Sequence, residues 1–494
     1  MTQLPHNLYR ASQVRDMDKT AIEEHQISGT ILMERAGSAA FELVQQLWPE
    51  AKTLSVFCGT GNNGGDGYVI ARLAHEHQYN VKVYQLGDSN HIQGDALAAL
   101  QRLEGAGLST RQMAGSEDFS HTEVFVDALL GTGFEGKVQG EYQQAIDIMN
   151  QASANILAVD VPSGLNADTG HVAGTAVKAD CTITFIGMKR GLLTADAADY
   201  CGQLRFDDLR IPQQIFEAQP AAAEILDYER LNHVLGKRAR CAHKGEFGHV
   251  LIIGGDHGMS GAVRMAGEAA QRVGAGLVSI ATRPEHAALL SVVRPELMCH
   301  GVTNPEQLKP LLEKTSVVAI GPGLGHSEWA EELKSEVMSS DLPMVVDADA
   351  LNLLAREHFR RNNWVLTPHP GEAARLLKSG SQAIQADRFA AAQQLQDQFG
   401  GVVVLKGAGS LVQCHDYPTG ICIDGNPGMA SGGMGDVLSG VIAGLIAQGL
   451  SLPDAARLGV VMHARAADMS VTAVGERGLL ATDLMVNLRR LANP

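Results

Sequence analysis

A glycine-rich loop that carries one carboxylate leads directly into an apolar segment of the chain. It reads Asn426-Pro427-Gly428-Met429-Ala430-Ser431-Gly432-Gly433-Met434-Gly435-Asp436, and residues 437–447 follow it. Glycines let backbone N–H groups converge without Cβ clashes, and a helix start adds unpaired N–H donors, so the pattern predicts a phosphate cradle. A carboxylate there repels phosphate, so we interpret Asp436 as the base for a hydroxyl that is phosphorylated. A helix cap is the alternative.

Other glycine-rich or polar sequences each follow a short apolar run in the second half of the chain. They read Gly254-Gly255-Asp256, Gly321-Pro322-Gly323-Leu324-Gly325, Asp347-Ala348-Asp349, Thr367-Pro368-His369-Pro370-Gly371-Glu372 and Lys406-Gly407-Ala408-Gly409-Ser410. Ligands of open α/β sheets bind beyond the carboxyl ends of the strands. We therefore expect these sequences to meet at one edge of a sheet, together with the Asp436 loop.

The residue types at these strand ends suit phosphoryl transfer. Lys406 is placed to contact a nucleotide phosphate as a point charge, and the amides of Gly407 and Gly409 can approach the nucleotide closely. Asp347 and Glu372 are candidates for a magnesium shell, which proteins usually hold through waters. The sequence thus predicts a nucleotide site with bound magnesium.

Two further elements are candidates for binding the acceptor of the phosphoryl group. His369 follows a predicted strand, although a lone histidine is as often structural. Ser260-Gly261-Ala262 opens another predicted helix and could hold a polar group of the acceptor.

The first half of the chain contains two more candidate cradles and one carboxylate at a strand end. The cradles are Gly59 to Gly67, which precedes the helical residues 68–74, and Gly131 to Lys137. A strand–loop–helix context is what a phosphate cradle requires. Asp160 ends another predicted strand, and we interpret it as an acid or base group, with a helix-cap partner as the alternative. It has no second carboxylate adjacent in sequence.

Short Val- and Ile-rich runs alternate with helix-length segments, which predicts two α/β domains built on parallel sheets. We place the domains at residues 1–215 and 224–494, with residues 211–223 as the linker. The predicted strands are residues 53–58, 81–86, 123–127, 156–161 and 181–186, then 249–253, 277–281, 317–320, 344–347, 364–367, 402–405, 410–414 and 420–423.

Composition argues against several classes of partner. Lys+Arg 39 against Asp+Glu 55 gives a net charge of −16, so we expect no nucleic-acid partner and no membrane surface. The cysteines are odd in number and form no Cys-x-x-Cys pair, which favours reduced thiols. Residues 1–20 lack the apolar core of a signal peptide, and the run 437–447 is too short to span a bilayer. We expect a cytoplasmic homo-oligomer.

From about residue 226 to 494 the sequence resembles the ribokinase-like fold, and within it the ADP-dependent NAD(P)H-hydrate dehydratases. The resemblance rests on the Gly-x-Gly-Asp loop, the Thr-Pro-x-x-x-Glu strand end, residues 321–325 and Asn426-Pro427-Gly428. It implies phosphorylation of the hydrated nicotinamide ring by ADP with Mg²⁺, and then loss of phosphate to give NADH or NADPH and AMP. It also implies nucleotide binding by Lys406, Gly407, Ala408, Gly409, Ser410 and Gly435, and hydrate binding by Ala262, Gly325, His369 and Asp436.

Over about residues 8–211 the sequence resembles NAD(P)H-hydrate epimerases, with a Rossmann-like three-layer sandwich. The resemblance implies that the R and S forms of NADHX and NADPHX are interconverted, with Asp160 as a contact and catalytic group. The implied substrate-binding residues are Asn62, Asn63, Gly64, Gly65, Asp66, Gly131, Thr132, Gly133, Phe134, Glu135, Gly136 and Lys137. Asn63, Asp127 and Ser163 match K⁺ ligands, and each offers a hard oxygen. The order of the two domains resembles the bifunctional NAD(P)H-hydrate repair enzymes.

Two other functions fit parts of this pattern. An ATP-dependent ribokinase-like small-molecule kinase, fused to a dinucleotide-binding module, explains the second half but gives no reason for the first. A non-catalytic dinucleotide sensor leaves Asp160 and Asp436 unexplained. The residues alone fit ADP and ATP equally.

Overall fold

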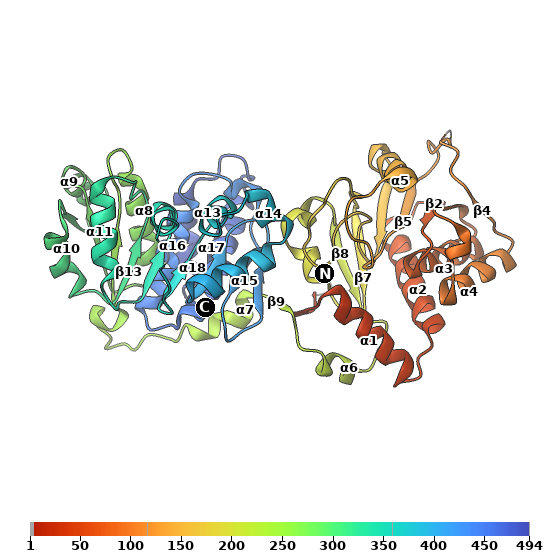
Figure 1. Cartoon of the computed structure of the whole chain (residues 1–494), viewed down its shortest axis with the longest axis horizontal. Helices are drawn as coiled ribbons and strands as arrows, with labels where there is room; N and C mark the ends of the chain where they lie inside the picture. The colour runs from red at the N-terminus through yellow and green to blue at the C-terminus, as the bar shows by residue number, and fades with distance from the viewer. Residues whose placement is uncertain (1–3, 116, 358, 494) are drawn as a thin grey trace. The chain divides into compact units, whose positions relative to one another are not determined.

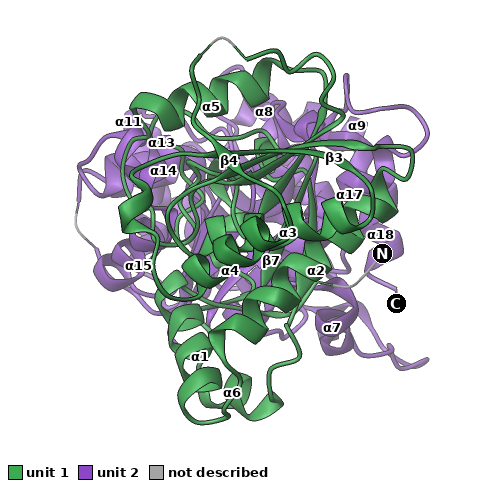
Figure 2. Ribbon diagram, turned by 90° about the vertical axis from the view of Figure 1, so that its right-hand side faces the viewer, with its two compact units in different colours: residues 1–224 green, residues 225–494 purple. Residues whose placement is uncertain are grey.

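Alternating short apolar strands and longer helices build two α/β units in the computed structural model of the chain. The structure describes residues 4–115, 117–357 and 359–493. One unit comprises residues 1–224 and the other residues 225–494 (Figure 2). Each unit is built around a large sheet and has its own buried core.

The sheet of the first unit is parallel throughout, as predicted. Its order is β4 (Thr110–Arg111), β3 (Asn80–Gln85), β2 (Thr53–Cys58), β5 (Val124–Ala128), β6 (Asn155–Val159), β7 (Cys181–Phe185) and β8 (Gln203–Asp207). Side chains alternate between the two faces: Leu54 and Val56 of β2 join one buried cluster, and Phe57 joins the other. Both faces are therefore buried, which explains why the central strands read as continuous apolar runs.

Helices lie against both faces of this sheet (Figure 1). They are α1 (Ala11–Glu23), α2 (Gly29–Leu47), α3 (Asn62–Glu76), α4 (Gly94–Gly105), α5 (Gly140–Gln151) and α6 (Gln213–Ala218), with short 3-10 turns at Ser89–His91, Arg190–Leu193 and Ala195–Asp199. Side chains of α2 and α3 pack in the same cluster as Leu54, whereas those of α5 pack with Phe57.

The stretch 211–223, predicted as the linker, is ordered structure of the first unit. Helix α6 lies within it, and Ile211 and Ile215 are buried in the core of that unit. The stretch ends in β9 (Ala223–Ile225), which pairs antiparallel with β1 (Asn7–Leu8). Its prolines and alanines therefore mark a helical turn and a short strand, and the division between the units follows Glu224.

The sheet of the second unit combines parallel strands with an antiparallel end. The strands run in the order β18 (Thr419–Cys422), β17 (Ser410–Gln413), β16 (Val402–Leu405), β15 (Trp364–Leu366), β14 (Met344–Val346), β13 (Val317–Ile320), β10 (His249–Ile253), β11 (Leu277–Thr282) and β12 (Met298–Gly301). Pairing is parallel from β16 to β12. β17 and β18 run antiparallel, which corrects the expectation of parallel strands there. The connections are too short for a crossover helix.

Helices also cover both faces of the second sheet. They are α7 (Tyr228–Leu231), α8 (Ser260–Arg272), α9 (Pro284–Val293), α10 (Pro305–Leu312), α11 (Glu328–Met338), α12 (Ala348–Leu354), α13 (Pro370–Leu376), α14 (Ser381–Ala386), α15 (Arg388–Phe399), α16 (Met434–Ala447), α17 (Leu452–Val471) and α18 (Leu484–Leu491), with 3-10 turns at Asn232–Val234, Lys244–Phe247, Pro427–Met429 and Ala481–Asp483. α8, α16, α17 and α18 share one buried cluster with the strands.

The parallel strands bring the polar sequences of the second half to one edge, as predicted. β13 ends at Ile320, β14 at Val346 and β16 at Leu405, so the glycine loop, Asp347 and Lys406 follow at the same edge. Helix α16 begins at Met434, inside the glycine-rich loop.

Helices α8 and α16 approach each other at glycines of α16. A Cβ on Gly440 would lie 2.0 Å from the carbonyl oxygen of Ala266, and one on Gly444 would lie 2.7 Å from that of Ala270. The two helix backbones are therefore in direct contact, which only glycine permits at these positions. Since the N-termini of both helices reach the edge where the strands end, this contact fixes those two N-termini relative to each other.

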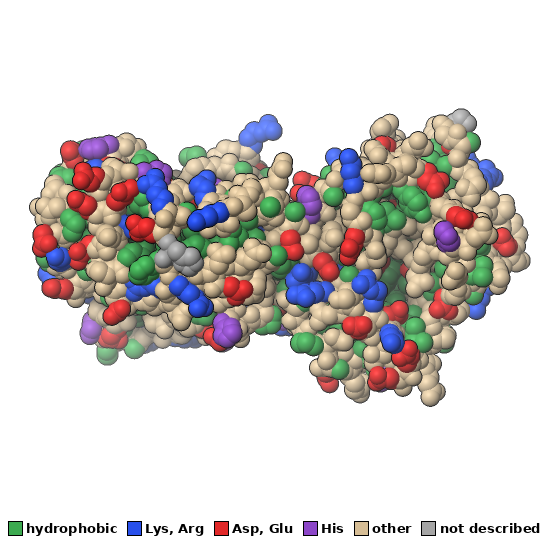
Figure 3. Space-filling view, in the orientation of Figure 1, with side chains coloured by type: hydrophobic (Ala, Val, Ile, Leu, Met, Phe, Trp, Pro, Cys, Tyr) green, Lys and Arg blue, Asp and Glu red, His purple; other side chains and the backbone are tan. Residues whose placement is uncertain are grey.

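Basic and acidic side chains are interspersed on the face seen in Figure 3. Among the described residues, no helix is long and apolar enough to cross a membrane.

We predict that Gly440→Ala lowers the thermal-unfolding midpoint of the protein. The added methyl group forces α8 and α16 apart, and overpacking of this kind costs about 1–3 kcal/mol. Gly261→Ala on α8 is the matched control, because a Cβ there meets no atom within 4 Å. An equal midpoint for Gly440→Ala and the wild type would contradict close backbone packing.

Candidate functional site

A buried ion pair joins two strand ends of the second unit. Lys406 donates from Nζ to Asp347 Oδ1 at 2.7 Å, and Ser439 of α16 donates from Oγ to Asp347 Oδ2, also at 2.7 Å. The side chain of Asp347 is 2% exposed. Glu372 Oε2 lies 3.8 Å from Lys406 Nζ. One lysine is thus held between two carboxylates at the edge where the strands end.

The charges of this cluster stabilise one another. Burial alone would raise the pKa of Asp347, but the charge and hydrogen bond of Lys406 hold that pKa below its usual value. Burial would lower the pKa of Lys406, and Asp347 and Glu372 instead raise it. Both groups are therefore ionised at neutral pH. The pKa of Glu372 is raised by burial and by the charge of Asp347.

Asp436 lies in the first turn of α16, beside this cluster. Burial, and then the negative charge of Asp347, raise the pKa of Asp436 to about 7, although Lys406 opposes the rise. At neutral pH the carboxyl group is divided between its two protonation states, which suits a general base. Its neighbour Gly435 is close enough to Lys406 that a Cβ would lie 3.3 Å from Nζ.

The predicted nucleotide-binding loop, Lys406 to Ser410, is fixed by hydrogen bonds within the loop and from helix α15. Gly407 and Gly409 have φ angles of 144° and 61°, and Ser410 donates from Oγ to the Gly407 carbonyl at 2.9 Å. Arg388 of α15 is 1% exposed and donates to the carbonyl oxygens of Leu405, Lys406 and Gly409. Sequence reasoning missed Arg388, because its partners are backbone atoms of a distant segment.

The predicted acceptor residues lie at neighbouring loops of the same edge. Gly325 donates its backbone N–H to Asp349 Oδ2 at 2.9 Å, and a Cβ on it would lie 3.0 Å from Asp256 Oδ2. Ala262, in the first turn of α8, lies against the Gly323 turn.

His369 acts locally as a helix cap. Its Nδ1 accepts from the Gly371 N–H at 3.0 Å, and its own backbone N–H donates to Glu372 Oε2 at 2.8 Å. The side chain is 51% exposed, so its outer nitrogen can still meet a ligand. The position of His369 is therefore compatible with both interpretations of the sequence, a structural role and contact with the acceptor.

A cavity of about 590 Å³ in the first unit brings the loops of that half together. Its predicted lining residues are Asn62, Asn63, Asp66, Gly131, Thr132, Gly133, Phe134 and Asp160. Glu135, Gly136 and Lys137 are not among the residues that line it.

Gly64 and Gly65 lie inside α3 and do not line the cavity. A Cβ on Gly64 would lie 2.0 Å from the Gly59 carbonyl oxygen, and one on Gly65 would lie 2.6 Å from the sulfur of Met33. Most of the predicted loop is therefore the start of a helix. These two glycines let that helix pack closely against its neighbours.

Asp160 is held by a buried lysine that sequence reasoning missed. Lys189, whose side chain is 1% exposed, donates from Nζ to Asp160 Oδ1, to Thr184 Oγ1 at 3.0 Å and to the Phe185 carbonyl at 2.9 Å. Asp160 has a φ of 67°, an unusual conformation that functional residues often adopt. The sequence feature that could have identified Lys189 is its place shortly after the predicted strand of residues 181–186.

The cavity also supplies the second carboxyl group that is absent from the sequence around Asp160. Asp66, from α3, lines the same wall, and burial, followed by the charges of Asp160 and Asp18, raises its pKa well above the ordinary value. The cavity thus contains a carboxylate paired with lysine and a second carboxyl group that favours the protonated form. This combination suits acid–base chemistry.

The predicted potassium ligands lie close together around the Leu130 carbonyl oxygen, and Asn63 also lines the cavity. Ser163 donates from Oγ to Asp127 Oδ1 at 2.6 Å, and Asn63 donates from Nδ2 to the Leu130 carbonyl at 3.1 Å. Within the described residues, the buried Oδ1 of Asn63 has no hydrogen-bond donor. Burial raises the pKa of Asp127 to about 6. A buried carboxylate and an unsatisfied amide oxygen are groups that a bound cation would stabilise.

Two family models match the chain. A model described as NAD(P)H-hydrate dehydratase matches residues 250–490, and one described as YjeF-related protein N-terminus matches residues 29–191. The two matched ranges fall in the second and the first unit, respectively.

Curated relatives match over almost the full length. The chain is 52% identical to the bifunctional NAD(P)H-hydrate repair enzyme Nnr of Coxiella burnetii over 99% of both chains. It is 45% identical to the enzyme of the same name from Escherichia coli K12, over 99% of this chain and 95% of that one. A solved ribokinase-like superfamily protein from Enterococcus faecalis V583 is 28% identical and covers 56% of this chain and 99% of its own, with a TM-score of 0.51.

We predict that Asp436→Asn stabilises the protein more at pH 8 than at pH 5. The raised pKa of Asp436 means that the folded state binds the extra proton, so wild-type stability falls as pH rises from about 4 towards 7. Asparagine removes this titration. Urea-unfolding midpoints of both proteins at the two pH values measure the difference. A difference independent of pH would contradict the raised pKa.

Proposed function

The chain belongs to the family of bifunctional NAD(P)H-hydrate repair enzymes, and on that premise we propose that its two units act in succession on hydrated nicotinamide dinucleotides. The first unit interconverts the R and S forms of NADHX and NADPHX. The second converts the S form to NADH or NADPH, with ADP as phosphoryl donor. The observation that carries the proposal is a carboxyl group with a pKa of about 7 at the start of α16, beside the Lys406 cluster.

In the second unit, Asp436 accepts the proton of the ring hydroxyl as its oxygen attacks the terminal phosphorus of ADP. The bond from that phosphorus to the bridging oxygen breaks, and AMP leaves. Phosphate then departs from the ring with the electron pair of its C–O bond, the adjacent ring carbon loses a proton to water, and the double bond of the reduced nicotinamide forms. A positioned base contributes about 10²–10⁴-fold to such a step.

The neighbouring residues bind and orient the nucleotide. Lys406 offers its ammonium group to the phosphates, and the N–H groups of the first turn of α16, which lack partners inside the helix, face the same region. Gly407, Ala408, Gly409, Ser410 and Gly435 form the nucleotide-binding surface in this proposal.

Magnesium fits this site as an ion that enters with the nucleotide. Both oxygens of Asp347 already accept hydrogen bonds, and Glu372 accepts one from His369. Asp347 and Glu372 would therefore hold Mg²⁺ through waters rather than directly. Its chemistry there is neutralisation of phosphate charge.

In the first unit, Asp160 contacts the hydrated ring and transfers a proton of that ring, while the hydrogen bond from Lys189 holds Asp160 in place. Asp66, with its raised pKa, lies in the same cavity and is suited to donate a proton. Asn62, Asn63 and residues 131–134 would bind the rest of the dinucleotide. A K⁺ ion would be held by Asn63, Asp127 and Ser163, and would neutralise the buried Asp127 carboxylate. Homo-oligomerisation and a cytoplasmic location stay predictions from the sequence.

One assay tests both activities. An R/S mixture of NADHX is incubated with ADP and Mg²⁺, and the absorbance of NADH is followed. We expect the wild type to convert both forms, Asp160→Asn to convert the S form and leave the R form, and Asp436→Asn to lose about 10²–10⁴-fold in turnover. Near-normal turnover in Asp436→Asn would contradict the role of that residue as base.

Measurements of ADP binding distinguish the proposed role of Asp436 as base from the proposed role of Lys406 in phosphate binding. Asp436→Asn is expected to bind ADP as well as or better than the wild type, because it removes a negative charge near phosphate. Lys406→Ala is expected to weaken ADP binding. Calorimetric titration of ADP into both variants measures this contrast, and AMP formation distinguishes ADP use from ATP-dependent phosphorylation.

The potassium proposal has its own test in Asp127→Ala. We expect this variant to lose epimerisation and its dependence on K⁺, and to retain ADP-dependent conversion of the S form, because the affected carboxylate lies in the other unit. Epimerisation is measured as the rate of the slow phase in the R/S assay at several K⁺ concentrations. Wild-type rates at every concentration would contradict the assignment of Asp127.

A further inference from the structure

The second unit has another cavity, at the end opposite to the Lys406 cluster. It has a volume of about 350 Å³ and is lined by residues near the C-terminal ends of α8 and α18, and by the loops that precede β10 and β12. Gly274, on its wall, comes just before β11 begins at Leu277. Helix α8 has 13 residues and so spans about 20 Å between the two sites. This cavity is therefore separate from the proposed nucleotide site.

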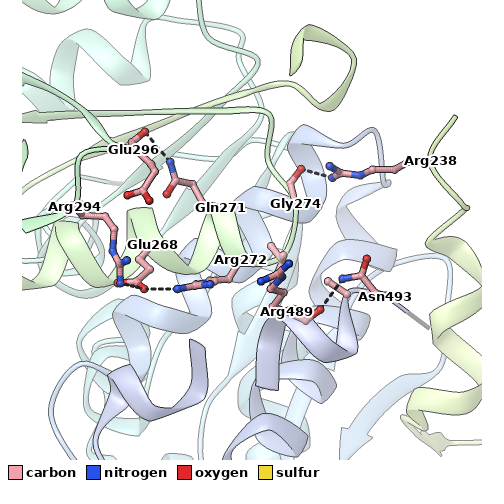
Figure 4. A pocket seen from close by; sticks show the side chains of 11 residues that line it. Arg238, Glu268, Gln271, Arg272, Gly274, Arg294, Glu296, Arg489 and Asn493 are labelled. Carbon is pink, nitrogen blue, oxygen red and sulfur yellow. Dashed lines mark hydrogen bonds and ion pairs between the residues drawn. The ribbon is translucent and has the colours of Figure 1, made fainter. Parts of the chain in front are cut away.

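Arginines dominate the lining of this cavity (Figure 4). The charged residues are Arg238, Arg272, Arg294, Arg489, Glu268 and Glu296. Four positive and two negative charges give a local net charge of +2, in a chain whose net charge is −16. Cations gathered in a hollow attract small anions, because the field of a cleft is focused by its walls.

A buried carboxylate organises two of these arginines. Glu268 of α8 is 3% exposed, and its Oε1 accepts from Arg294 and, at 3.4 Å, from Arg272 (Figure 4). The one carboxylate balances only one of the two guanidinium charges. Because each guanidinium has five N–H donors, both arginines retain donors for a ligand.

The other two arginines of the cavity differ in the contacts that their guanidinium groups make with the protein. Arg238 donates to the Gly274 carbonyl and, at 2.7 Å, to Gln448 Oε1, and its guanidinium stacks on Phe247 at 3.6 Å. The guanidinium of Arg489 forms no hydrogen bond or ion pair with residues 4–115, 117–357 or 359–493. The cavity wall therefore includes a cation whose donors are wholly uncommitted.

We propose that this cavity binds a small anion that carries phosphate groups, independently of the nucleotide at Lys406. Planar guanidinium groups bind phosphate oxygens through paired N–H donors, and several of them together suit a dianion or a more highly charged group. The volume lies near the lower limit for small-molecule sites, and the wall is too polar for an apolar ligand. Arg272 and Arg489 supply the uncommitted donors, and Arg294 and Arg238 complete the positive wall.

The test is calorimetric titration of inorganic pyrophosphate into the full chain with Lys406→Ala, which weakens the phosphate site of the opposite edge. We expect the dissociation constant of one site to rise about tenfold or more when Arg272→Gln and Arg489→Gln are added, because two charge-assisted contacts are lost. Arg272→Gln leaves Glu268 paired with Arg294, so the fold is expected to persist. Titrations that are identical with and without these two substitutions would overturn the proposal.

Matched controls separate a specific site from general charge. Arg356→Gln with Lys309→Gln removes two positive charges from residues that do not line the cavity, and is expected to leave the titration unchanged. An equal loss in this control, or equally tight binding of citrate, would also overturn the assignment to phosphate. Arg489→Gln alone, which breaks no contact of its guanidinium, is expected to weaken binding in the same direction and serves if the double substitution unfolds the protein.

Discussion

The ion pair of Lys406 and Asp347 is the interaction on which the proposed chemistry of the second unit depends. Two opposite charges can remain ionised away from water only when each is paired and hydrogen-bonded, and Ser439 and Glu372 complete that arrangement. The pair joins two strand ends and, through Ser439, helix α16. Because the negative charge of Asp347 also raises the pKa of Asp436, this pair adjusts the protonation of the neighbouring carboxyl group. In the proposed mechanism, nucleotide binding and proton transfer would therefore be electrostatically linked within one cluster.

The first unit contains two carboxyl groups, Asp160 and Asp127, whose surroundings differ. Asp160 is balanced by a lysine from its own unit, whereas Asp127 is buried beside neutral hydroxyl and amide groups. The hydrogen-bond partners of Asp127, which are Leu129 and Ser163, carry no charge, and burial raises the pKa of Asp127. The proposed potassium ion would supply the missing positive charge.

The sequence predicts the fold well where strands are apolar on both faces. β2, β10, β13 and β16 have the bounds predicted, because continuous Val- and Ile-rich runs bounded by turn residues leave little choice. The edge strands β8 and β12 were missed, since polar and partly exposed residues interrupt their patterns.

The site was predictable to the extent that its residues lie in short motifs. The loops around Lys406, Asp436 and Asp160 were found from their glycines and their places at strand ends. Lys189 and Arg388 were not found, because each acts on atoms that only the folded chain brings near. The family expected from the sequence is confirmed by relatives that match nearly the whole chain, whereas the roles of individual residues stay predictions.

The contact of α8 with Gly440 and Gly444 has a consequence for specificity. Because the backbones of these helices are in contact, their packing sets the position of the start of α16, with Asp436, relative to the start of α8, with Ala262. The spacing between Asp436, the proposed base, and Ala262, a proposed contact of the acceptor, is then set by helix packing. A change of acceptor size must be accommodated by the loops on either side, residues 254–258 and 321–325. Those loops are where variants with altered substrate range should be sought.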